Sequence, residues 1–222
     1  MPNGEVSVGK ALPYFLEDHL TPTWQSEAPS NAVKITDLNL IQQDKQLFTE
    51  QHFHGKNNLI AFIFTSCIGF CPTLVKKLQR IEETLPKNSE LHFTLITVDP
   101  EHDTHRVLKS YAQTHDILTQ KNWTLVTGNK EEIYSLIRDT FASEVKNNSD
   151  GELRNFAHTE RFYLIDKNAH LRAVFQGRLK GVEYEILGAL KKLARPQSRE
   201  LSSVSQNQAA GLSASLDSKP VK

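Results

Sequence analysis

A run of six consecutive apolar residues, Leu59 to Phe64, limits the folds open to this chain more than any other feature of its sequence. Such a run is typical of a central strand that is buried on both faces of a sheet, because a strand with one solvated face would alternate with polar residues. Residues 74–85 then carry apolar side chains at helical spacing, and Pro86 closes the segment. A buried strand followed directly by an amphipathic helix predicts an α/β fold.

The same alternation continues to residue 193. Strands are predicted at 91–98, 123–126, 162–165 and 171–175, and helices around 107–112, 133–141 and 186–193. The last two strands flank the turn that begins at Asp166, so they form a hairpin. This order predicts a thioredoxin-like fold of the α/β class, in which a central mixed sheet has flanking helices and a C-terminal β-hairpin, with an insertion between the second and third core strands. An additional strand is expected near residues 33–38.

The two ends of the chain differ from the middle in composition. Residues 1–31 contain prolines among small and polar residues and are expected to form an extended leader, ahead of a folded domain over residues 32–195. Residues 196–222 are rich in Ser and Gln and contain no aromatic residue. Such a segment cannot bury enough apolar surface to offset its ordering entropy, so it is predicted to be a disordered tail.

Charge and hydropathy exclude several classes of partner. The chain of 222 residues has 26 Lys and Arg against 26 Asp and Glu, and its net charge is therefore zero. Binding to nucleic acid or to an anionic membrane surface needs a basic excess, so neither is expected. No apolar run approaches the ~20 residues that span a bilayer, and the N-terminus lacks the features of a secretory signal. The chain as given is expected to be soluble.

The two cysteines of the chain, Cys67 and Cys71, lie just after the predicted buried strand. Two cysteines make neither a disulfide scaffold nor a four-sulfur zinc site, so they act as a pair if they act at all. Pro72 suits the first position of a helix, which places Cys71 near the N-cap, where the helix dipole favours a thiolate. Thiolates bind soft ions such as Cu(I). Two other readings stay open: a pair of buried structural cysteines, and a redox pair with wider spacing than the thioredoxin CxxC motif.

Three motifs, taken in this order and spacing, resemble the SCO family (also called SenC), whose members are thioredoxin-fold copper chaperones for cytochrome c oxidase. They are Cys67-xxx-Cys71-Pro72, the segment 98–104 with the sequence VDPEHDT, and His158 ahead of the strand at 162–165. The resemblance extends over roughly residues 33–193. It implies that Cys67, Cys71 and His158 are metal ligands that bind copper as Cu(I) and Cu(II).

The same resemblance implies the partners and the location. The partners would be the copper-site subunit of cytochrome c oxidase and other copper chaperones. The protein would lie in the periplasm, or be anchored in a membrane and face the periplasm, or in a eukaryote face the mitochondrial intermembrane space. The leader resembles the segment that follows the N-terminal membrane anchor in some bacterial members, so such an anchor is expected to precede it.

Two functions remain open from the sequence. In the first, the protein is a metallochaperone, not an enzyme, and delivers copper to the binuclear copper site of cytochrome c oxidase during assembly. In the second, it is a thiol-disulfide oxidoreductase that reduces the cysteines of that site with Cys67 and Cys71 as the redox pair. A peroxidase is disfavoured, because residues 60–67 lack a proline and a threonine at the spacing at which they precede the reactive cysteine of peroxiredoxins.

Four polar residues are weaker candidates. Asp99 and Asp103 follow the second core strand and could orient the site or contact a partner, although capping of the helix after Thr104 explains Asp103 equally well. His52 and His54 could form a weak copper site on one side of a strand, but a solvated loop is the preferred interpretation.

Overall fold

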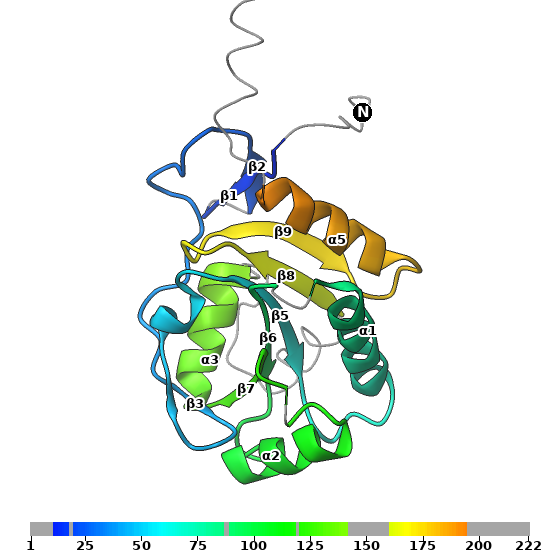
Figure 1. The fold of residues 1–222 in the computed structure, drawn as a ribbon. Coiled ribbons are helices and arrows are strands. Elements are labelled where there is room, and N and C mark those ends of the chain that lie inside the picture. Colours follow the sequence, from blue (N-terminus) through cyan, green and yellow to red (C-terminus); the bar gives the residue numbers. More distant parts are fainter. Residues whose placement is uncertain (1–10, 18–19, 87–88, 119, 142–159, 195–222) are drawn as a thin grey trace, which may run out of the picture.

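The computed structural model describes residues 11–17, 20–86, 89–118, 120–141 and 160–194 (Figure 1). Its centre is a seven-stranded mixed sheet with the strand order β4-β3-β7-β6-β5-β8-β9. The strands are β3 (Leu40–Gln42), β4 (Leu47–Phe48), β5 (Asn57–Ile63), β6 (Leu91–Thr97), β7 (Trp123–Thr127), β8 (Arg161–Ile165) and β9 (Leu171–Gln176). The α/β class and the thioredoxin-like order of the core elements are confirmed.

The middle of this sheet is β5, the strand predicted from the apolar run. It pairs in parallel with β6 on one side and antiparallel with β8 on the other. All of its residues from Asn58 to Ile63 are buried. A strand that is covered on both faces and paired on both edges has no solvated side, which is the physical reason for its uninterrupted apolar sequence.

Helices cover both faces of the sheet. They are α1 (Phe70–Thr84), α2 (His105–Thr114), α3 (Lys130–Leu136), which continues into the π-helical segment η2 (Ile137–Phe141), and α5 (Val182–Leu193). In Figure 1, α1 and α5 lie on one side of the sheet and α3 on the other. On the α3 side, Phe62 of β5 packs edge-on against Phe141, with ring centroids 5.2 Å apart. This contact confirms Phe62 as a core residue.

The N-terminal segment is more structured than the predicted extended leader. It forms the two-stranded hairpin of β1 (Tyr14–Leu16) and β2 (Thr21–Thr23), which lies beside β9 (Figure 1). Arg172 of β9 holds it: the guanidinium donates to the carbonyls of Pro13 at 2.9 Å and Leu12 at 2.7 Å. The predicted tail, residues 196–222, lies outside the described residues.

The expected strand at 33–38 is wrong. Lys34 makes only an isolated bridge, to His170, and the first strand of the central sheet along the chain is β3. Asp37 has a φ of +54°, in the left-handed region, and this interrupts the extended backbone that a strand requires. Val33 and Ile35 are buried because they pack against the β8–β9 hairpin turn, where the backbone N–H of Ile35 donates to the carbonyl of Ala169 at 3.0 Å.

None of the helices in the described ranges has the length and apolar character needed to cross a membrane.

Candidate metal centre

Both cysteines lie where the sequence predicts, in the connection from the carboxyl end of β5 to the start of α1. Both are buried, with 9% of Cys67 and 5% of Cys71 exposed, and both are free thiols. The backbone N–H of Cys71 donates to the Sγ of Cys67, with the two atoms 3.5 Å apart. The helix N-terminus is therefore directed at the sulfur of Cys67, and the two cysteines are brought together as expected.

The start of α1 differs from the prediction. The N-cap is Gly69 and the helix begins at Phe70, so Cys71 is its second residue and Pro72 its third. Proline is tolerated there as well as at the first position, because none of the first four N–H groups of a helix has a partner within the helix. Gly69 has a φ of −99° and open space around it, so the turn does not depend on glycine for steric reasons.

The pKa values of the two thiols are shifted in opposite directions. Burial disfavours the Cys67 thiolate, but hydrogen bonds from the backbone and side chain of Cys71 and from the backbone N–H groups of Gly69 and Phe70 outweigh it and lower the pKa of Cys67. Burial raises the pKa of Cys71 to about 12, and the neighbouring charges of Cys67 and Glu160 act in the same direction. Without a metal, Cys67 is therefore the more acidic thiol of the pair, and Cys71 keeps its proton.

A buried carboxylate fixes the loop that carries Cys67. Asp103 has no exposed surface, and its Oδ2 accepts from the backbone N–H of Thr65 at 2.9 Å and from the hydroxyl of Thr97 at 2.6 Å. Its Oδ1 accepts from the hydroxyl of Thr65. The helix cap is Thr104, whose hydroxyl accepts from the N–H of Val107 at 3.4 Å, so capping by Asp103 is wrong. Asp103 instead ties the ends of β5 and β6 together, directly before the cysteine pair.

Asp99 joins this network through its backbone, because its N–H donates to the hydroxyl of Thr97 at 3.0 Å. It is partly exposed in the turn before α2, where its backbone carbonyl accepts from the N–H of Asp103 at 2.8 Å. The hypothesis that Asp99 orients the site or contacts a partner stays a prediction.

Sequence reasoning missed two other residues close to the pair. Glu160 is 4% exposed and makes a two-pronged salt bridge with Arg178, in which Nη2 donates to Oε1 at 2.7 Å and Nε donates to Oε2. Tyr111 of α2 is also buried, and its phenol is within the electrostatic influence of both cysteines. Tyr111 belongs to the apolar stripe of the helix predicted around 107–112, but nothing local marks it as a neighbour of the cysteines, and Glu160 belongs to no local pattern.

The third predicted ligand, His158, lies outside the described residues, and its role stays a prediction. Within the described ranges, no group of three or more His, Cys, Asp or Glu side chains is arranged to hold a metal ion. The described part of the candidate centre is the two thiols. Their sulfur donors, close together and shielded from water, fit a soft ion such as Cu(I) better than a hard ion that prefers oxygen ligands.

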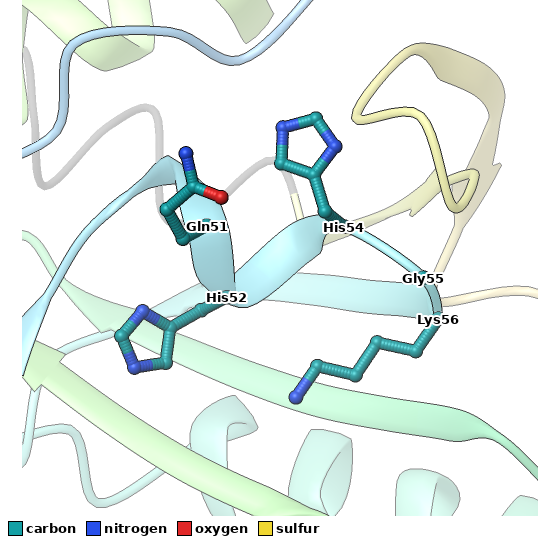
Figure 2. A pocket seen from close by; sticks show the side chains of 5 residues that line it. All are labelled: Gln51, His52, His54, Gly55 and Lys56. Carbon is teal, nitrogen blue, oxygen red and sulfur yellow. The ribbon is translucent and has the colours of Figure 1, made fainter.

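The weak copper site considered at His52 and His54 does not form. The two residues lie at and just after the short helix η1 (Glu50–Phe53) and line a shallow pocket, but their rings point in different directions (Figure 2). The Nδ1 of His52 accepts from the backbone N–H of Thr49 at 3.1 Å, and its Nε2 lies 3.1 Å from the side-chain nitrogen of Gln42. The ring nitrogens of His52 are therefore engaged within the protein.

Comparisons with known proteins agree with this arrangement. The SCO1/SenC family profile matches residues 26–195. The SCO2-like protein of Rickettsia prowazekii is 35% identical over 134 residues, which are 59% of this chain and 63% of that relative. The match therefore spans less than two thirds of the relative's length.

Two solved structures share the fold. BsSco, a member of the Sco family of cytochrome c oxidase assembly proteins in which a disulfide switch was identified, has a TM-score of 0.63 and 23% identity, covering 76% of this chain and 98% of its own. Copper-bound yeast Sco1 has a TM-score of 0.55 and 24% identity, covering 71% of this chain and 93% of its own. A family profile that matches more than half of the sequence, together with the shared thioredoxin-like fold, establishes that this chain belongs to the SCO1/SenC family.

Proposed function

We propose that this protein is a copper metallochaperone, which binds copper through Cys67, Cys71 and His158 and delivers it to the binuclear copper site of cytochrome c oxidase during assembly. The observation that carries the proposal is the pair of free, buried thiols at the N-terminus of α1, the backbone N–H of Cys71 donating to the sulfur of Cys67. Membership of the SCO1/SenC family and the likeness to copper-bound yeast Sco1 support it.

The thiol pair suits a cargo that must be held and then released. Two thiolates and one imidazole give a soft, low-coordinate site for Cu(I), and such an open site leaves room for an acceptor's ligands to attack. The lowered pKa of Cys67 eases the loss of its proton, whereas the raised pKa of Cys71 means that its proton must be displaced by the bound ion. Because copper competes with that proton, the affinity for Cu(I) is expected to rise with pH.

The partners follow from the same proposal. We infer that the acceptor is the copper-site subunit of cytochrome c oxidase and that other copper chaperones supply the ion. Delivery of copper to that subunit would require the domain at residues 32–195 to lie outside the cytoplasm, in the periplasm or in the mitochondrial intermembrane space. BsSco belongs to a family of cytochrome c oxidase assembly proteins, which supports this choice of acceptor.

Thiol-disulfide exchange is the second candidate, and the unequal acidity of the two thiols favours it. The Cys67 thiolate would attack a disulfide of the partner, forming a mixed disulfide and releasing one partner thiolate. Cys71, once deprotonated, would then attack Cys67 and release the second. The partner gains two electrons as a dithiol, and this chain is left with a Cys67–Cys71 disulfide.

A copper titration tests the chaperone function. The reduced full chain is titrated with Cu(I) against a coloured chelator, beside Cys67→Ser, Cys71→Ser and His158→Ala, with His54→Ala as the control histidine. The chaperone proposal expects one tightly bound ion, lost in both cysteine variants, weakened in His158→Ala and unchanged in His54→Ala. Unchanged Cu(I) affinity in the cysteine variants would refute it.

For the reductase candidate, the same variants are mixed with an oxidised peptide that contains one disulfide, and released thiols are counted. Loss of activity in Cys67→Ser with full activity in His158→Ala would support exchange. Equal and negligible activity in the original chain and in Cys67→Ser would exclude it.

A further inference from the structure

The carboxylate of Asp103 holds one residue of the cysteine loop at two points. It has no exposed surface, and a buried charge is costly unless hydrogen bonds replace the water that it loses. The backbone N–H of Thr65 donates to its Oδ2 at 2.9 Å, and the hydroxyl of Thr65 donates to its Oδ1. Another bond comes from the hydroxyl of Thr97, at the end of β6, at 2.6 Å. Asp103 therefore fixes both the backbone and the side chain of a residue two positions before Cys67.

A single peptide group links Asp103 to Cys67. This is the peptide between Phe64 and Thr65: its N–H donates to Asp103, and its carbonyl accepts from the backbone N–H of Cys67 at 3.1 Å. Because a peptide group is planar, a carboxylate that fixes its N–H also fixes the direction of its carbonyl. The sulfur of Cys67 then accepts from the backbone N–H of Cys71 at 3.5 Å. A continuous series of hydrogen bonds thus runs from the carboxylate to the sulfur.

The two ends of this series differ in how firmly the fold holds them. The backbone N–H of Asp103 donates to the carbonyl of Asp99 at 2.8 Å, in the turn directly before α2, so the carboxylate stands on a fixed base. The turn between the cysteines lies outside the core: Ile68 is 99% exposed, and open space surrounds the position that a Cβ of Gly69 would take. Packing contributes little on the outer side of this turn, so the hydrogen bonds at its base set the position of the Cys67 sulfur.

We propose that Asp103 is a positioning residue of the copper centre, which acts through Thr65 to hold the sulfur of Cys67 in its ligating position before the ion arrives. The inference rests on the proposed copper function. A ligand that is already in place loses less conformational freedom on binding, so preorganisation raises the affinity without any contact between Asp103 and the ion. Hydrogen-bond partners that orient metal ligands contribute about 10–100-fold to the affinity for the metal.

The test compares two substitutions at the same carboxylate. Thr65→Val and Thr97→Val each remove one hydroxyl that donates to Asp103, nearly keep the shape of the side chain and leave the bond from the Thr65 N–H in place. Thr97→Val also removes the acceptor of the Asp99 N–H, so it costs at least as much stability and is a strict control. Thr65→Ser keeps the hydroxyl and is the conservative variant. The Cu(I) affinity of the reduced full chain is measured against a coloured chelator, and urea unfolding gives the stability of each variant.

A second readout needs no copper. The amide of Cys71 lies in the first turn of α1 and donates to the sulfur of Cys67, so its hydrogen exchange in the reduced, copper-free chain reports the position of that sulfur. We expect Thr65→Val to weaken Cu(I) binding about tenfold and to speed exchange at Cys71, because the base of the loop is less firmly held. Thr97→Val should lower stability alone, since both bonds from Thr65 to Asp103 remain. Thr65→Ser should match the original chain in both readouts.

Unchanged Cu(I) affinity and unchanged exchange at Cys71 in Thr65→Val would overturn the inference. Equal changes in Thr65→Val and Thr97→Val would overturn it too, because they would follow from lost stability and not from the position of the loop. Failure of the proposed function is distinct from both outcomes, since Cu(I) binding by the original chain would then not depend on Cys67. Exchange of the Cys71 amide would still decide in that case whether Asp103 positions the sulfur.

Discussion

Asp103 offers a sharp test of how the fold supports the cysteine loop. Its carboxylate has no exposed surface and accepts three hydrogen bonds, two from Thr65 and one from Thr97. Asp103→Ala removes both acceptor oxygens, so the N–H and hydroxyl of Thr65 and the hydroxyl of Thr97 lose the group to which they donate. Asp103→Asn keeps the shape and one acceptor oxygen but removes the charge.

The magnitude follows from these contacts. A hydrogen bond to a charged group contributes about 1.5–3 kcal/mol, and bonds that share one carboxylate are not additive. Removing the carboxylate also removes the cost of keeping a charge out of water, which offsets part of the loss. We therefore expect Asp103→Ala to lower the free energy of unfolding by about 3–5 kcal/mol and Asp103→Asn by about 1–2 kcal/mol.

Urea unfolding of the reduced protein at pH 7 measures both variants, with Asp139→Asn as the control, because Asp139 is largely exposed. Hydrogen exchange at the Thr65 amide adds a local readout: exchange should be faster in both Asp103 variants, since this N–H loses its charged acceptor. A loss below about 1 kcal/mol in Asp103→Ala, with unchanged exchange at Thr65, would refute the reasoning.

Three further predictions concern other parts of the fold. Arg172→Met leaves Asp166 buried without its cation, so thermal unfolding should show a loss of about 3 kcal/mol that Arg172→Lys does not fully restore; an unchanged melting temperature would contradict this. Gly177→Ala places a methyl group against the backbone carbonyl of Glu160, and urea unfolding should report a free energy of unfolding lower by about 1–3 kcal/mol. An unchanged free energy of unfolding would contradict this, because it would mean that the backbone after β9 moves aside without cost. Burial, with the charge of Lys56, lowers the pKa of His92 to about 4, so the unfolded chain binds more protons between pH ~6.5 and ~4. Stability should fall by about 1–2 kcal/mol as the pH drops through that interval, and His92→Gln should flatten the profile, whereas an unaltered profile would assign the pH dependence elsewhere.

The elements that the sequence predicted best are those whose signal is local and repeated. The burial of β5 and the apolar face of α1 appear directly as a continuous run and as a helical spacing. The position of the cysteine pair then follows from topology, because the loop after a central parallel strand lies at the carboxyl ends of the strands, where α/β proteins bind their ligands. The resemblance that named the family rests on the same short segments.

The errors arose where a tertiary contact overrode a local pattern. Residues 33–38 alternate like a strand, but the left-handed backbone of Asp37 and the pairing with the hairpin turn prevent a regular one. Asp103 stands where a helix cap is common, but Thr104 takes that role and frees the carboxylate for the ends of β5 and β6. In each case the sequence pattern was correct as a propensity, and a distant partner decided the outcome.

The sequence by itself determined the order of the core elements from β5 onward, the central strand and the presence of two thiols at its carboxyl end. These are properties of neighbours along the chain, and periodicity or spacing records them. Only the tertiary structure decided what surrounds the thiols: Asp103 holds Thr65 across 38 positions of sequence, and Glu160 and Tyr111 bring a carboxylate and a phenol within electrostatic reach of the thiols. Such contacts depend on how strands and helices pack, and a single sequence carries no local mark of a partner that folding brings near.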